Sequence, residues 1–288
     1  MTQHRRIHLP GLVDLTFVAD AASIVEANAS AALDRDFAAK GPLLNRLLTG
    51  RIRRTLVVAG QPFPAVAPKD FPGRAARQIA LEENLKSQCQ AFEADIISQI
   101  ATEVINPGRD TELARLAQHL TGRSFIPTFV ATAETWAAAE TLEMAVQSNN
   151  PLRQLASNLS GKTTKARNLL AGKMDQDPVA VHAIGIAIHN FVLSLKRMRM
   201  ILSQHTDVDR IVTLSLAAPP RVLRQATGSG KGLVVMELEK CRAKTLRRDM
   251  AFMQGTWSSC PAHAWVPAAL AAVAREALRQ RSEKGEQP

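Results

Sequence analysis

The amino-acid sequence predicts a mainly α-helical domain with a small β lobe. Its 288 residues are 46% hydrophobic, which is enough to bury a sizeable core. Alanine, leucine and isoleucine recur at helical spacing over several long segments, whereas β-branched runs bounded by glycine or proline are few and short. We find no internal repeat and no clear linker, so we expect a single domain over residues 1–288.

The N-terminal part holds the first predicted strands, residues 15–20 and 55–60, with an Ala-rich helix between them. Residues 60–73 carry four prolines and two glycines, so we expect an irregular loop there. The strand-bearing lobe is therefore predicted mainly from residues 1–70, completed by residues 210–240 from later in the chain.

The helical core is predicted over residues 74–205 and 261–281. The expected helices are residues 74–103, a helix broken near Pro127, residues 132–147, residues 179–202 and residues 267–281. The helix at 179–202 is apolar around most of its circumference, so it should run through the middle of the domain.

The C-terminal third is predicted to hold two more strands, residues 211–216 and 233–238. The prolines and glycines between them indicate turns. A basic stretch up to Asp249 reads as irregular, and the polar tail after the last helix should be frayed.

Composition narrows the class of protein. A formal net charge of +10 favours acidic partners, but the chain has no Tyr and only 4% aromatic residues, so a nucleic-acid interface is not favoured. A basic helical nucleic-acid-binding protein remains an alternative. Three scattered cysteines indicate a reducing compartment, and we see neither a signal peptide nor a membrane span. We therefore expect a cytoplasmic protein without a membrane partner.

The most informative segment is RDMAFMQGTWSSCPAHAWVP, residues 248–267. A cysteine in a loop that enters a helix meets backbone N–H groups and a dipole that favour its thiolate. The segment resembles the cysteine loop of the cytochromes P-450, in which Phe and Gly precede the Cys that ligates haem iron. The matching residues here are Phe252, Gly255 and Cys260, followed by Pro261 and Ala262.

Other segments resemble the same family in the same order along the chain: TFVADAASIVEA near the N-terminus, and later APPRVLRQA and GLVVMEL. The resemblance implies a haem-thiolate oxidoreductase of the monooxygenase or peroxygenase type, with haem b held by Cys260 and a propionate bound by Arg224. It also implies an apolar small-molecule substrate beside Gly185 and Ala187, and an acidic ferredoxin-type electron donor at a basic face from Lys240 to Arg248.

The chain departs from the family pattern in ways that describe a shortened, degenerate member. The Glu and Arg of the family's E-x-x-R helix would fall at Thr213 and Leu216, and Ser258 replaces a common propionate ligand. The acid and alcohol that deliver protons are also missing, and polarity alone suggests His189 as a catalytic substitute. A descendant that only binds haem, another ligand or a partner is therefore an alternative.

Several motifs also allow plainer interpretations. Cys260 could be an inert buried thiol, or it could join Cys241 and His263 in a zinc site that lacks a fourth ligand. His182 and His189, seven residues apart, share a predicted helix face and are more typical of core histidines than of metal ligands. Residues 156–163 fit a loose phosphate-loop pattern, but the segment before them reads as helix instead of strand.

Overall fold

A computed structural model describes residues 4–35, 41–106, 108, 110–147, 160–227 and 232–285. The helices are α1 (Ala21–Ala29), α2 (Leu43–Thr55), α3 (Arg74–Gln88), α4 (Ala94–Ile105), α5 (Asp110–Arg123), α6 (Ala133–Gln147), α8 (Lys162–Lys173), α9 (Pro178–His182), α10 (Ile188–Ile201), α11 (Val208–Ser215), α12 (Leu238–Thr245), α13 (Arg248–Phe252) and α14 (Trp265–Glu283). A π-helical segment, η1 (Ala183–Ala187), joins α9 to α10, and a 3₁₀ turn, η2 (Pro261–His263), precedes α14. The strands are β1 (Arg5–Leu9), β2 (Val13–Val18), β3 (Leu33–Asp34), β4 (Val57–Val58), β5 (Gln61–Pro62), β6 (Val222–Ala226) and β7 (Leu233–Met236).

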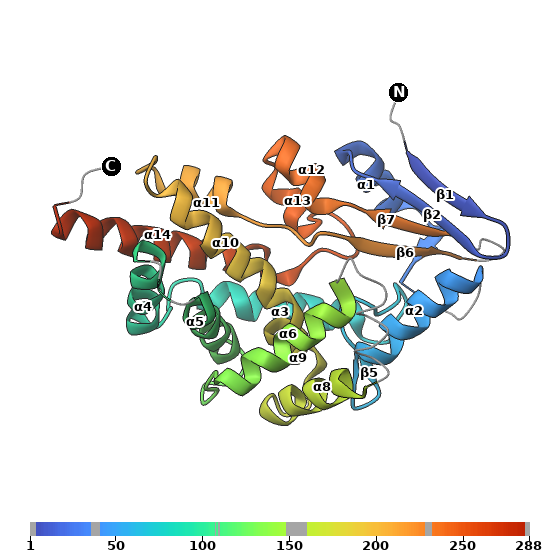
Figure 1. Cartoon of the computed structure of the whole chain (residues 1–288), viewed down its shortest axis with the longest axis horizontal. Helices are drawn as coiled ribbons and strands as arrows, with labels where there is room; N and C mark the ends of the chain where they lie inside the picture. Colours follow the sequence, from blue (N-terminus) through green and yellow to red (C-terminus); the bar gives the residue numbers. More distant parts are fainter. Residues whose placement is uncertain are drawn as a thin grey trace.

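The larger sheet joins the N-terminal strands to the strands at residues 222–236. Its strand order is β1-β2-β7-β6-β3, and β2 pairs in parallel with β7, with Leu15 opposite Leu233. The other pairings in this sheet are antiparallel. Figure 1 shows the sheet at one end of the molecule and the helices filling the rest. The predicted class, mainly α with a small β lobe, is confirmed.

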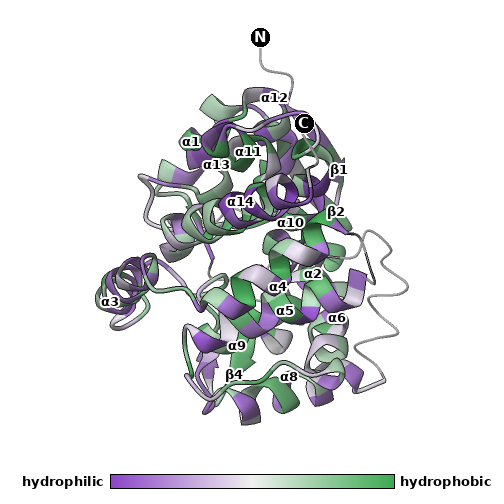
Figure 2. Cartoon of the chain, turned by 90° about the vertical axis from the view of Figure 1, so that its left-hand side faces the viewer, coloured by the Kyte–Doolittle hydropathy of each residue, from purple (hydrophilic) through white to green (hydrophobic). Residues whose placement is uncertain are grey.

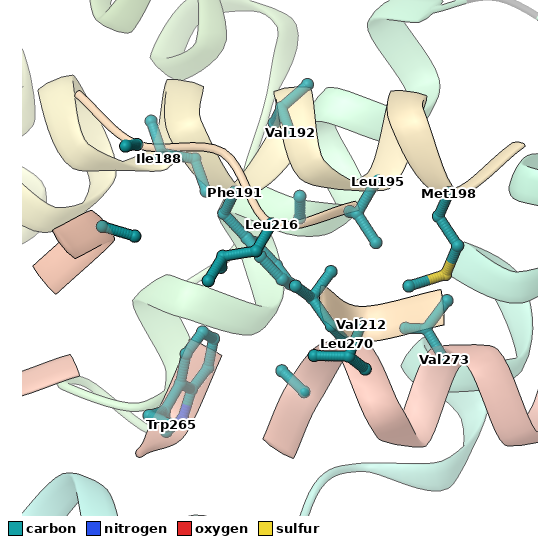
Figure 3. Packing of buried hydrophobic residues seen from close by; sticks show 14 of the residues in the cluster. Ile188, Phe191, Val192, Leu195, Met198, Val212, Leu216, Trp265, Leu270 and Val273 are labelled. Carbon is teal, nitrogen blue, oxygen red and sulfur yellow. The ribbon is translucent and has the colours of Figure 1, made fainter. Parts of the chain in front are cut away.

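The core is centred on α10, as the sequence predicts for residues 179–202. Figure 3 shows Phe191, Leu195 and Met198 of α10 meeting Val212 of α11 and Leu270 of α14. Each of these side chains is almost fully buried, and burial of one such side chain stabilises the fold by about 1.5–3 kcal/mol. The α10–α14 contact therefore fixes the C-terminal helix against the middle of the domain.

One continuous helical run, Pro178–Ile201, is the single candidate in the described ranges that could cross a membrane by length and composition. Its most apolar window is 56% buried inside the molecule, and core helices of globular domains pass the same test. Figure 2 shows the apolar α10 enclosed by neighbouring helices. Packing against α5, α11 and α14 accounts for its apolar character.

Three predicted elements differ from the structure. Residues 211–216 were expected to be a strand, but residues 211–215 belong to α11 and Leu216 is its C-cap, because the Asp207 side chain caps the backbone N–H groups of Asp209 and Arg210. The predicted strand 55–60 is reduced to the two residues of β4 after α2. The basic stretch before Asp249, expected to be irregular, forms α12 and the start of α13.

One further helix needs correction, because the predicted helix 74–103 is divided into α3 and α4. The C-terminal helix, predicted over 267–281, begins at Trp265. Pro267 therefore lies in the first turn of α14, where the backbone N–H groups have no partner within the helix in any case.

Candidate functional site

A cavity of about 560 Å³ lies between the cysteine loop, α3, the η1–α10 helix and the β lobe. This volume is within the usual range for cofactor and small-molecule sites. Cys260, Phe252, Ala187 and Asn190 all line it. Most of the wall is apolar, but four arginines belong to it, and the described wall includes no Asp or Glu. They are Arg35, Arg74, Arg77 and Arg221.

The backbone of the cysteine loop is held at several points. After α13, Met253 and Gly255 have positive φ angles of 51° and 73°, which turn the chain back. The Cys260 amide then donates to the Phe252 carbonyl at 2.8 Å, which closes the loop. Gln78 of α3 donates to the Ser259 carbonyl at 3.0 Å, so α3 fixes the loop from outside. Cys260 is thereby placed at the entry to η2 and α14.

The Cys260 thiol is half-buried at the cavity wall. Burial raises its pKa above the usual range, although a hydrogen bond from the Ala262 amide and the charge of Arg35 act in the opposite direction. In the protein alone the thiol therefore keeps its proton at neutral pH. A metal that coordinates the sulfur would remove that proton.

Four cations surround the indole of Trp257, three residues before Cys260. The guanidinium carbons of Arg74, Arg35 and Arg224 lie 4.4, 5.1 and 5.1 Å from the ring centroid, and the Lys69 ammonium lies at 5.2 Å. The indole nitrogen donates to the Asn28 carbonyl at 2.9 Å, which fixes the ring between the cations. We call these four residues the Trp257 cation cluster.

The positive charge of the Trp257 cation cluster is not fully balanced by nearby carboxylates. Burial and repulsion from neighbouring arginines hold the pKa of Arg35 well below its usual range, and burial lowers that of Arg224 to about 9. Asp34 is the acid that opposes these shifts. The buried Nε atoms of Arg35 and Arg224 have no hydrogen-bond partner in the described part of the chain. This donor set suits an anionic ligand, above all carboxylates.

Arg224, the predicted propionate anchor, lies behind the cavity wall. It is fully buried, and it donates to the Asn28 side chain at 2.8 Å and to the Ser258 hydroxyl at 2.7 Å. Arg35 and Arg74 are the members of the cation cluster that line the cavity. Sequence reasoning missed both residues, because neither belongs to a motif and each comes from a segment remote from the cysteine loop.

The other predicted site residues are divided between the cavity and the packed interior. Phe252 and Ala187 line the cavity, whereas Gly255 lies exposed in the turn. Gly185 faces α6 and α8, since a Cβ added there would lie 2.9 Å from a Leu142 methyl carbon. The small size of Gly185 is therefore explained by helix packing.

The two histidines of this helix point in different directions. His182 lines the cavity, where burial and then the charge of Arg35 lower its pKa to about 4, so it is neutral at physiological pH. His189, the predicted catalytic residue, is outside the cavity lining: its Nδ1 lies 3.0 Å from a Glu143 carboxylate oxygen, and its ring packs on Trp136. The expected shared face is absent, because the wider turn of η1 rotates the residues that follow it.

The basic run from Lys240 to Arg248 is largely used within the fold. Arg242 is buried and donates to the Thr213 carbonyl, and Arg248 donates to the Thr213 hydroxyl, 2.9 Å from its Nε. Thr213 stands where the family's Glu was expected, so two arginines attach α12 and α13 to α11 without that carboxylate. Lys240, Lys244 and Arg247 remain exposed.

The alternative sites gain no support from geometry. Cys241 is fully buried in the core cluster, and within the described ranges no group of three His, Cys, Asp or Glu side chains is arranged to hold a metal ion. Residues 156–159 of the phosphate-loop pattern lie outside the described residues. Gly161, with a φ of 69°, directly precedes α8.

Comparison with solved structures identifies the fold, which is that of the cytochromes P-450. No protein-family model and no curated protein matches the sequence. The structure is similar to CYP105N1 from Streptomyces coelicolor A3(2), with 12% identity, a TM-score of 0.56 and coverage of 96% of this chain and 84% of that one. It is also similar to cytochrome P-450SP alpha (CYP152B1) in complex with (R)-ibuprophen, with 15% identity, a TM-score of 0.54 and coverage of 94% and 84%. A six-coordinated cytochrome P-450 from Thermus thermophilus matches with 12% identity, a TM-score of 0.52 and coverage of 94% and 85%.

Proposed function

We propose that this chain is a cytoplasmic haem-thiolate oxidoreductase, a shortened and degenerate relative of the cytochromes P-450 that acts on an apolar small molecule. The observation that carries the proposal is that one apolar cavity brings together Cys260, the cationic residues Arg35 and Arg74, and the small residue Ala187. The P-450 fold supports the same proposal at the level of architecture.

The residues present fit haem b. Cys260 would bind the iron through its sulfur, and Arg35 and Arg74 would hold the propionates, since their charges lack matching carboxylates on the cavity wall. Arg224 then has a positioning role, because from behind the wall it fixes the Trp257 ring and Ser258, which lines the cavity. When bound, haem with a thiolate ligand supplies one-electron and oxygen chemistry.

The remaining wall residues would bind and orient the substrate. Ala187, Phe191 and Ile186 present apolar surface, and the neutral imidazole of His182 and the Asn190 side chain are polar groups available to orient it. The Ser194 hydroxyl is already engaged, because it donates to the Asn190 carbonyl and accepts from the Ala217 amide. An acidic ferredoxin-type donor would meet the exposed Lys240, Lys244 and Arg247, and its association should weaken with salt.

Absorbance of protein purified with ample haem supply tests the proposal. We expect a Soret band that moves to longer wavelength in the reduced carbon monoxide complex, and Cys260→Ala should lose that shift. Cys89→Ala is the matched control, because Cys89 is also half-buried and free but does not line the cavity. No haem in the parent protein, or an unchanged spectrum in Cys260→Ala, would show that the proposed ligand is wrong.

A second candidate is a haem- or ligand-binding protein without turnover. The helix wall favours it, because η1 and α10 place no acid in the described lining and the Ser194 hydroxyl is engaged elsewhere. Turnover of apolar test substrates with peroxide, or with ferredoxin and its reductase, separates the two candidates. Haem binding with a thiolate spectrum but no product under either condition would favour the second.

A further inference from the structure

The β lobe carries an exposed apolar surface outside the cavity. It is formed by the β1–β2 hairpin and the start of α2, which lie side by side in Figure 1. The Leu43 amide donates to the Gly11 carbonyl at 3.0 Å and the Leu44 amide to the Leu12 carbonyl at 2.9 Å, so the two segments form one surface. Its large apolar side chains, each 40–57% exposed, are Ile7, Leu9, Leu12, Leu43, Leu44 and Leu47. We call this set the hairpin surface.

The charges around the hairpin surface are almost all positive. The sequence of α2 contains four arginines and no acidic residue, and Arg46 and Arg53 are exposed. On the hairpin side, exposed Arg5 adds to the positive charge. Arg6 pairs with the Asp14 carboxylate at 3.1 Å, so these two charges largely cancel.

Helix α2 connects this surface to the cavity. Leu48 and Ile52 of α2 line the cavity, whereas Leu43, Leu44 and Leu47 face outward. Leu15 and Phe17 of β2 also line the cavity. Helix α2 therefore carries both cavity-lining residues and exposed leucines, whereas Ile7 of β1 lies directly opposite Leu15, on the same face of the sheet.

We propose that the hairpin surface docks on an anionic phospholipid bilayer. Exposed leucines flanked by arginines are the features of an element that lies in the membrane interface, with apolar side chains among the acyl chains and cations at the headgroups. A second copy of the chain fits less well, because a symmetric contact would bring like-charged arginines together. This docking is peripheral, so it is compatible with a cytoplasmic protein, but it departs from the expectation that the chain has no membrane partner. It does not depend on haem or on the proposed activity.

Co-sedimentation of the full chain with vesicles tests this proposal. We expect binding to vesicles of phosphatidylglycerol and phosphatidylcholine, and weak binding to pure phosphatidylcholine. Leu47→Glu should weaken binding to the anionic vesicles at least about tenfold, which corresponds to about 1.4 kcal/mol. Met200→Glu is the matched control, since Met200 is 67% exposed on α10, outside the hairpin surface, and the added charge is the same.

Three results would overturn the proposal: equal binding of Leu47→Glu and Met200→Glu, equal binding to anionic and neutral vesicles, or no vesicle binding at all. Analytical ultracentrifugation without vesicles adds a further check. A dimer that Leu47→Glu dissociates, in a protein that ignores vesicles, would assign the surface to a second copy. Thermal unfolding of both variants verifies that each substitution leaves the fold intact, as expected for exposed side chains.

Discussion

The two walls of the cavity use polar groups in opposite ways. The wall around Trp257 and Cys260 concentrates cations, with Arg35 and Arg74 at its surface and Arg224 behind it. The wall formed by α9, η1 and α10 is apolar apart from His182, Asn190 and Ser194. Buried like charges are costly unless a ligand neutralises them, whereas an apolar wall is stable without one.

This contrast separates two questions about function. An anionic cofactor in the cavity would need cations to balance its charge. The wall around Trp257 and Cys260 supplies such cations. Under the proposed function the apolar wall would contact the substrate, and its described lining offers a neutral histidine and an amide but no carboxylate. Cofactor binding and turnover should therefore be tested separately. Substitutions at the cationic wall should change haem binding more than substitutions at the apolar wall change ligand binding.

The largest effect is expected from removing charge at the cationic wall. The double variant Arg35→Gln/Arg74→Gln should weaken haem binding at least about a hundredfold, because each hydrogen bond to a charged group contributes about 1.5–3 kcal/mol. Titration with haem, followed by Soret absorbance, measures this change. Arg210→Gln/Lys244→Gln is the control with the same loss of charge at exposed positions. If both double variants bind haem as the parent does, the cation cluster is not the propionate site.

The next largest effect is a pH dependence of haem affinity. Below its raised pKa the Cys260 thiol carries a proton in the free protein, and iron coordination would release it. Each unit of rising pH therefore lowers the cost of releasing this proton by about 1.4 kcal/mol, so affinity should rise about tenfold per unit from about pH 6 to 8. Cys260→His should flatten this slope above about pH 7, since a neutral imidazole has no proton to lose there. A flat profile in the parent protein would exclude thiolate ligation.

The sequence predicted the helical core and the irregular loop after residue 60, because these depend on local periodicity and on prolines and glycines. It also singled out Cys260, which lies on the cavity wall, because Cys260 belongs to a compact motif. The sequence-based prediction failed where helix capping and tertiary packing outweighed the local residue pattern. The β-branched run at Ile211 and Val212 joined a capped helix that buries both side chains. It also could not find Arg35 and Arg74, since only tertiary folding brings these residues to the ring of Trp257.

The smallest effect separates two residues that the sequence treated alike. Gly185→Ala should destabilise the protein by about 1 kcal/mol, because the added methyl meets Leu142 and Leu170, although the ends of these side chains can move and Ala favours helix. Its ligand binding should not change. Ala187→Leu should leave the free energy of unfolding nearly unaltered but change the affinity for apolar ligands severalfold, because its side chain enters the cavity. Urea unfolding measures the stability of both variants, and ligand-induced Soret shifts measure their affinity for apolar ligands. The assignment is wrong if Gly185→Ala changes the affinity and Ala187→Leu changes the stability.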